Sequence, residues 1–136
     1  MAVFHLQIVS MDRLVYDGEV QSISCRTIHG DMAVQANHCN YCTAIGMGKA
    51  RLVEADGTER FAACIGGMLS VMDGECRLIP TTWEWSDEID VKRAEISKLK
   101  AEELLQRTDV AKKDLQLAEA RLKRALVRIG AAKIEI

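Results

Sequence analysis

The residues with the clearest capacity for chemistry are arginines that repeat at helical spacing near the C-terminus. Arg121, Arg124 and Arg128 fall at i, i+3 and i+7, which places them on one side of an α-helix. Arg93 lies on an earlier helical segment, and antiparallel pairing of the two segments would bring it toward Arg124 and Arg128. Guanidinium groups that converge without matching acids need an anion. The alternative is that each arginine is solvated or pairs with one of three acids, Glu119, Asp90 and Glu95.

A second arrangement with chemical potential is the pair Cys39 and Cys42, with His38 beside it. Structural zinc sites use four nitrogen or sulfur ligands, usually as two pairs of similar spacing, and this sequence has no second pair. A redox dithiol typically opens a helix whose dipole lowers the thiol pKa, whereas Thr-Ala-Ile-Gly follows here. The pattern favours a loop with two incidental thiols and no metal, and a zinc or thiol-redox module is the alternative.

The elements before residue 86 have the alternating pattern of β-strands joined by glycine turns. Asp-Gly pairs, which tolerate the backbone of tight hairpins, predict turns at Asp17-Gly18, Asp56-Gly57 and Asp73-Gly74. Gly66-Gly67 predicts a bulge or a sharp strand corner, and Pro80 is expected to end the last strand because it lacks an amide donor. Eight or so short strands without a helix predict an antiparallel β-sandwich or flattened barrel.

From residue 90 onward the periodicity is helical. Asp90 and Asp109 are expected to cap helices that end at Arg107 and before Gly130. A narrow stripe on the second helix predicts a helix–helix interface formed by Ala111, Leu115, Ala118, Leu122, Ala125 and Ile129. The first helix would supply Val91, Ala94, Ala101 and Leu105. Its other apolar residues, Ile96 and Leu99, would stay uncovered, which suggests a second packing arrangement.

Composition separates the two halves of the chain. Residues 1–88 carry six Lys/Arg against twelve Asp/Glu, whereas residues 89–136 carry twelve against eight. The basic half suits nucleic acid, an acidic protein surface, a phosphorylated ligand or simply solvent. No apolar run is long enough for a membrane span or a secretory signal. Five cysteines without an export signal indicate a reducing cytoplasm.

Taken together, the fold class expected is α+β. Residues 1–86 form the antiparallel β-sandwich or flattened barrel, and residues 87–136 form an antiparallel two-helix hairpin. No catalytic constellation is present, so we expect a non-catalytic protein.

This architecture resembles the epsilon subunit of F-type ATP synthase over essentially the whole chain. The N-terminal marks of the resemblance are Phe4-His-Leu-Gln-Ile-Val-Ser10, Asp17-Gly18, Gly30-Asp31-Met32, Asn37-His38, Thr43-Ala44-Ile45, Gly48 and Gly66-Gly67-Met-Leu-Ser-Val71. Their order and spacing are specific to the family, although each one alone is weak.

The start of the helical half is similar to the ATP-recognition motif of that family, Ile/Leu-Asp-x-x-Arg-Ala. The matching residues here are Ile89, Asp90, Arg93 and Ala94. The resemblance implies that Glu84, Lys100, Arg124 and Arg128 complete an ATP site, with Lys100 where ATP-binding members have arginine. ATP would be a regulatory ligand, and no cofactor would be required.

The resemblance also implies the role and the partners. The β domain would bind the gamma subunit and rest on the membrane c-ring, coupling proton flow to ATP synthesis. Asp31 and His38 would contact the c-ring, with both loops at the membrane-facing end. The hairpin would switch between a folded state and a state extended along gamma, toward the alpha/beta catalytic hexamer, that inhibits ATP hydrolysis. The protein would be peripheral on the cytoplasmic face of the bacterial plasma membrane, touching the membrane only through the c-ring.

A nucleic-acid-binding module is the rival from another class, motivated by the basic hairpin. Few aromatic residues, a net acidic N-terminal half and no recognised docking motif count against it, and no nucleic-acid partner is expected.

Overall fold

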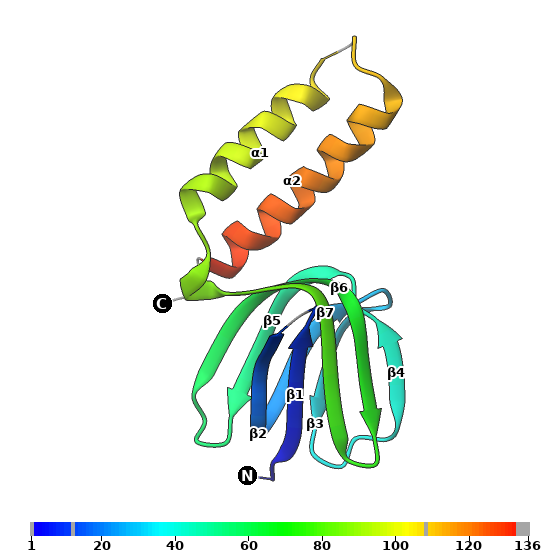
Figure 1. The fold of residues 1–136 in the computed structure, drawn as a ribbon, viewed down its shortest axis with the longest axis vertical. Coiled ribbons are helices and arrows are strands. Elements are labelled where there is room, and N and C mark those ends of the chain that lie inside the picture. The colour runs from blue at the N-terminus through cyan, green and yellow to red at the C-terminus, as the bar shows by residue number, and fades with distance from the viewer. Residues whose placement is uncertain (1, 12, 108, 133–136) are drawn as a thin grey trace.

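The computed structural model describes residues 2–11, 13–107 and 109–132, and it shows a β-barrel with a helical hairpin standing on one end (Figure 1). The strands are β1 (Phe4–Ser10), β2 (Arg13–Thr27), β3 (Gly30–Gln35), β4 (Tyr41–Ala44), β5 (Met47–Glu54), β6 (Glu59–Met72) and β7 (Glu75–Trp85). The 3-10 helix η1 (Ser86–Glu88) leads into α1 (Val91–Leu105) and α2 (Lys112–Ala132). The α+β class expected from the sequence is confirmed.

The sheet closes because β1 has a neighbour on each side. It pairs antiparallel with β2 and parallel with β7, so that β1, β7, β6, β5 and β2 form a ring. Strands β3 and β4 lie outside that ring, against β2 and β6. The described strands are fewer and longer than expected, and the β1–β7 pair departs from the antiparallel prediction.

Alternating side chains fill the barrel. Leu6 and Ile8 of β1, Leu52 of β5 and Leu78 of β7 are fully buried there. Trp83 packs edge-on against Trp85 with ring centroids 5.1 Å apart, at the end of β7 that leads to the helices. Apart from Ile45, which lies between β4 and β5, the buried residues of this core belong to strands, which gives the barrel its own hydrophobic interior.

Gly66 and Gly67 form a strand corner. Their φ angles are +69° and +104°, and β6 pairs with β5 before them and with β4 after them. The register of β6 with β7 continues unshifted across the corner, so it is not a bulge. A Cβ at Gly67 would lie 2.0 Å from the carbonyl oxygen of Ile79, which leaves room only for glycine.

Two sequence predictions about strand ends are wrong. Strand β7 runs through Pro80 to Trp85, because β1 pairs with β7 only as far as Leu78 and leaves one side without a neighbouring strand. The pair Asp17-Gly18 lies inside β2 and not in a turn, since both residues stay paired with β1. The hairpins at Asp56-Gly57 and Asp73-Gly74 are confirmed.

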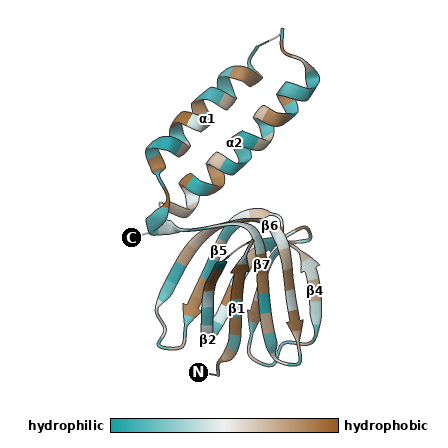
Figure 2. Ribbon diagram, in the orientation of Figure 1, coloured by the Kyte–Doolittle hydropathy of each residue, from teal (hydrophilic) through white to brown (hydrophobic). Residues whose placement is uncertain are grey.

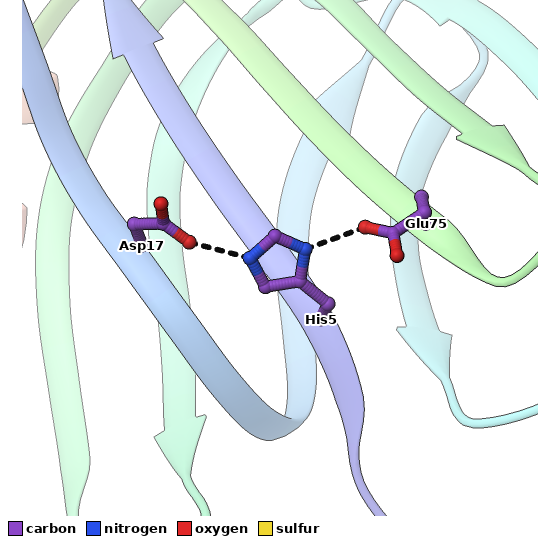
Figure 3. Close-up of polar contacts among 3 residues, drawn as sticks. All are labelled: His5, Asp17 and Glu75. Carbon is purple, nitrogen blue, oxygen red and sulfur yellow. Dashed lines mark hydrogen bonds and ion pairs between the residues drawn. The ribbon is translucent and has the colours of Figure 1, made fainter.

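His5 bridges the three strands at the barrel closure (Figure 3). Its Nδ1 lies 2.5 Å from Oε2 of Glu75 on β7, and its Nε2 contacts Oδ1 of Asp17 on β2. Both ring nitrogens can donate together only in the imidazolium form. The hydrogen bond to Glu75, followed by that to Asp17, raises the pKa of His5 above its ordinary value of 6.5.

The helices pack against each other through small residues. Ala94 and Ala101 of α1 and Ala118 and Ala125 of α2 are buried, as the stripe predicted, whereas Ala111 precedes α2 and is exposed. Hydrophobic and hydrophilic positions intermingle along both helices (Figure 2). None of the described helices is both long and apolar enough to cross a membrane.

Helix ends differ from the expectation in three places. Helix α1 ends at Leu105, with Gln106 as its C-cap, and not at Arg107. The amides of Asp114 and Leu115 both bond to the carbonyl of Ala111, so α2 begins at Lys112 and not after Asp109. At the other end α2 continues past Gly130 to Ala132, because Gly130 does not adopt the left-handed conformation of a helix stop.

Candidate functional site

The start of α1 fixes the first group of site residues. Asp90 caps the helix, with its Oδ1 accepting from the amide of Arg93 at 3.1 Å. This confirms the predicted cap and leaves the Arg93 side chain exposed. Ala94 follows on the buried side, against α2.

A salt bridge joins α2 to the end of β7. Nε of Arg128 donates to Oε1 of Glu84 at 2.5 Å, and both side chains are partly buried. The sequence offered Glu119, Asp90 and Glu95 as partners for the arginines, and the structure gives Arg128 a different one, 44 residues away. A contact over that separation depends on how the hairpin docks.

These residues line a cavity of about 350 Å³ between the hairpin and the end of β7. Its charged members are three acids and two arginines: Glu84, Glu88, Asp90, Arg93 and Arg128. Ala94 and Ser97 complete the wall. Five predicted ATP-site residues therefore line this cavity, which contains both acidic and basic side chains: Glu84, Asp90, Arg93, Ala94 and Arg128.

A second cavity, of about 480 Å³, lies between α1 and α2 and shares Ser97 and Arg128 with the first. Its charged lining is entirely basic, consisting of Lys100, Arg121, Arg124 and Arg128. The two cavities together form a groove with an acidic end at the barrel and a basic end between the helices. This distribution of charge suits an elongated ligand whose anionic part lies between the helices and whose uncharged part lies at the barrel end.

Comparison with known proteins identifies the family. Residues 3–86 match the model described as "ATP synthase, Delta/Epsilon chain, beta-sandwich domain", and residues 87–133 match that for the "long alpha-helix domain". The chain belongs to the ATP synthase Delta/Epsilon chain family.

Relatives support the same assignment along nearly the whole chain. The ATP synthase epsilon chain of Ruminococcus albus is 34% identical over 133 residues, covering 97% of this chain and 98% of that one. That of Caldicellulosiruptor bescii is 35% identical, covering 98% and 96%. The expectation of a non-catalytic epsilon-type chain of ATP synthase is confirmed.

Solved structures share the fold. The cryo-EM structure of the Euglena gracilis mitochondrial ATP synthase contains a chain that matches with a TM-score of 0.85 at 22% identity, covering 97% of this chain and 82% of that one. A match in the Tetrahymena thermophila mitochondrial ATP synthase has a TM-score of 0.61 at 11% identity, covering 95% and 96%.

Within this epsilon-type chain, one predicted ATP-site residue lies elsewhere. Ile89 lines neither cavity and packs against Ala63 of β6 and Ala131 of α2. Its position next to Asp90 in the motif gave no sign of this, because docking against the barrel is a long-range event.

Two polar residues outside the predicted ATP site, Ser97 and Arg121, line the basic cavity, and a third, Glu88, lines the cavity at the end of β7. The i, i+3, i+7 spacing of Arg121 with Arg124 and Arg128 was the available signal. Ser97 carried none, since a lone serine on a helix is usually solvated.

The expectation that the loops of Asp31 and His38 lie at the same end of the barrel is wrong, whereas their contact with the c-ring stays a prediction. Strand β3 separates them, with Asp31 opposite Arg26 near the β2–β3 turn and Gln35 opposite Ser22 at the far end. His38 follows that far end, where the side chain of neighbouring Asn40 accepts from the amide of Asp73. The six-residue extended strand keeps the two loops apart.

In the part of the chain that the structure describes, the thiols near His38 are not arranged as a metal site or a disulfide. Cys39 and Cys42 are exposed and free, and Nδ1 of His38 lies 2.7 Å from the carbonyl oxygen of Cys39. Among the described residues, no group of three or more His, Cys, Asp or Glu side chains is arranged to hold a metal ion.

Proposed function

We propose that the chain is the epsilon subunit in the central stalk of an F-type ATP synthase. In this role the barrel binds the gamma subunit and the c-ring, and so couples proton translocation to ATP synthesis. The protein is then peripheral, on the cytoplasmic face of the bacterial plasma membrane, and meets the membrane only through the c-ring. Family membership over both parts of the chain supports this role.

The hairpin is proposed as a mobile regulator that inhibits ATP hydrolysis when it leaves the barrel. The observation that carries the proposal is its docking surface, in which the buried apolar residues within the described part of the chain are Ala63, Ile89 and Ala131. So small an apolar contact holds the hairpin weakly. On the hairpin itself, Ile96 and Leu99 remain 54% and 65% exposed, which leaves apolar surface for the alpha/beta hexamer or gamma in an extended state.

ATP is proposed as the ligand that holds the hairpin folded. The groove lies between α1, α2 and the end of β7, so a ligand there contacts all three elements only in the docked state. Binding then favours that state by its differential affinity, and ATP releases the inhibition. Lys100, Arg124 and Arg128 balance much of the triphosphate charge, so Mg²⁺ is not required.

Calorimetry on the full chain tests the ATP site. Arg93→Ala and Arg128→Ala each remove a charge-assisted hydrogen bond of about 1.5–3 kcal/mol, which weakens ATP binding by about one to two powers of ten. Arg107→Ala is the matched control, because Arg107 is exposed near the hairpin tip and lines neither cavity. Absence of heat at millimolar ATP, or equal affinities in all four proteins, would refute the site.

Reconstitution with the partner complex tests regulation. Replacing the full chain by residues 1–88 is expected to raise the ATP hydrolysis rate while the fragment still assembles. Unchanged hydrolysis would contradict the inhibitory role of the hairpin.

A further inference from the structure

The basic cavity holds more positive charge than the proposed ATP site accounts for. Among the described residues, Arg128 has an acidic partner, whereas Lys100, Arg121 and Arg124 form no ion pair. Arg121 lines the cavity with an exposed side chain and is not one of the predicted ATP-site residues. Three unpaired cations that share a cavity repel one another, so the arrangement is unfavourable without an anion.

The charges are ordered along the groove. Glu84, Glu88 and Asp90 lie at the barrel end, next to Arg93 and Arg128. Helix α2 rises away from the barrel toward lower residue numbers (Figure 1). At 1.5 Å per residue, Arg124 lies about 6 Å farther along the helix axis than Arg128, and Arg121 about 10 Å farther. The helix therefore presents three guanidinium groups in sequence to a ligand that extends from the barrel end.

We propose that Arg121 is a further ligand-binding residue, which binds the terminal phosphate of a triphosphate and makes the groove sensitive to the number of phosphates. This inference rests on the nucleotide site proposed above. A single phosphate held beside Arg128 ends well short of Arg121, whereas a chain of three extends toward it. The planar guanidinium fork binds two oxygens of a terminal phosphate, which exposes more oxygens than a bridging one.

Because the cations in the cavity repel one another, the proposal predicts opposite effects of an Arg121 substitution on the stability of the free protein and on its affinity for the ligand. Without ligand, replacing Arg121 by Gln relieves repulsion, so the melting temperature of the free protein stays the same or rises. With ligand, the same substitution removes an interaction, so affinity falls. A residue that acted only by stabilising the hairpin would lower both quantities.

The experiment is calorimetry and thermal melting of the full chain with ATP, ADP and AMP, and with inorganic tripolyphosphate as a probe that lacks the nucleoside. The variants are Arg121→Gln, Arg121→Lys and, as the control, Lys123→Gln. Lys123 is exposed on α2, lies about 160° around the helix from Arg121 and lines neither cavity. The control therefore removes the same charge from the same helix outside the groove.

We expect Arg121→Gln to weaken ATP and tripolyphosphate binding by about tenfold or more, while ADP binding changes by less than about twofold. Arg121→Lys should retain part of the preference for ATP over ADP. Lys123→Gln should bind every ligand with the affinity of wild type. Equal losses for ATP, ADP and AMP, or no loss, would overturn the role of Arg121 and leave the nucleotide site standing. Failure of wild type to bind ATP would overturn both proposals.

Discussion

Gly67 shows how a single backbone position sets the shape of the barrel. Its φ of +104° and the absence of a side chain let β6 change its neighbour from β5 to β4 while it stays paired with Pro80 of β7. Any Cβ there would collide with the Ile79 carbonyl oxygen. The sequence predicted an irregularity at this glycine pair, because paired glycines disfavour a regular strand, but it did not identify the neighbour that forbids a side chain.

Gly67→Ala is expected to destabilise the barrel by more than about 3 kcal/mol, because the backbone strain of a positive φ adds to the collision. Gly74→Ala is the control, since Gly74 has a φ of +82° and a methyl group added there would meet nothing within 4 Å. That variant should lose only about 1–2 kcal/mol. Urea denaturation followed by tryptophan fluorescence measures both, and equal losses would exclude the steric contribution.

His5 makes barrel stability depend on pH. Its pKa is raised in the folded state, so its contribution to stability is fully present below the unfolded value of 6.5 and is lost as pH rises through the folded pKa. The difference in melting temperature between wild type and His5→Gln should therefore be larger near about pH 5.5 than near about pH 9. The effect is modest because the side chains are substantially exposed. A difference independent of pH would contradict protonation of His5 in the folded barrel.

At the scale of elements, the sequence predicted features that depend on a few neighbouring residues better than contacts between residues far apart in the chain. The Asp90 cap, the two Asp-Gly hairpins and the alanine stripe of the hairpin are encoded within a few residues, and the sequence predicted all of them. The Arg128–Glu84 salt bridge and the burial of Ile89 arise where α2 meets the barrel. The family resemblance placed Glu84 and Arg128 in one site, but their sequence separation carries no periodic signal, so the direct salt bridge and the burial of Ile89 came from the structure.

Helix α2 is attached to the barrel by its last turns, where Ala131 is fully buried against Ala63. Ala131→Glu places a charge in that contact and should release the hairpin without unfolding the barrel. Gly130→Glu is the matched control, because Gly130 is exposed and has open space around it. Hydrogen exchange should rise in α1 and α2 of the first variant alone. Equal protection of the helices in both variants would show that the contact does not hold them.

At the scale of the molecule, the barrel is expected to fold without the helices, because all the residues of its core cluster lie between Phe4 and Trp85. A fragment of residues 1–88 exposes Ala63 and loses Ile89 and both helices, but it keeps the closed ring of strands. Calorimetry should give a single cooperative melt for this fragment. A fragment without a cooperative transition would mean that the hairpin completes the barrel core.

The orientation of the barrel in the complex can be tested because Asp31 and His38 lie far apart. We expect the Asp31 end to face the c-ring, since Ile28 in the adjacent turn is 64% exposed and suits a protein contact. Asp31→Cys in a background with Cys39→Ser and Cys42→Ser should crosslink to a c-ring loop. Burial raises the pKa of Cys25 to about 11 and of Cys64 and Cys76 to about 12, so these thiols stay unreactive.

The native protein supplies the comparison for that crosslink, because exposed Cys39 lies next to His38 at the other end of β3. A c-ring crosslink from Cys39 and none from position 31 would reverse the orientation.

The parallel pairing of β1 with β7 has a consequence for how the protein is made. His5 and Glu75 are 70 residues apart in sequence, so β1 leaves the ribosome long before its second neighbour exists. Closing so long a loop is entropically costly, and contacts of this kind slow folding. The ring can close only when synthesis has passed Leu78, and α2 emerges after that point. The strands on which α2 docks are thus complete before the helix itself, so the helical hairpin is added to a barrel that can already have closed.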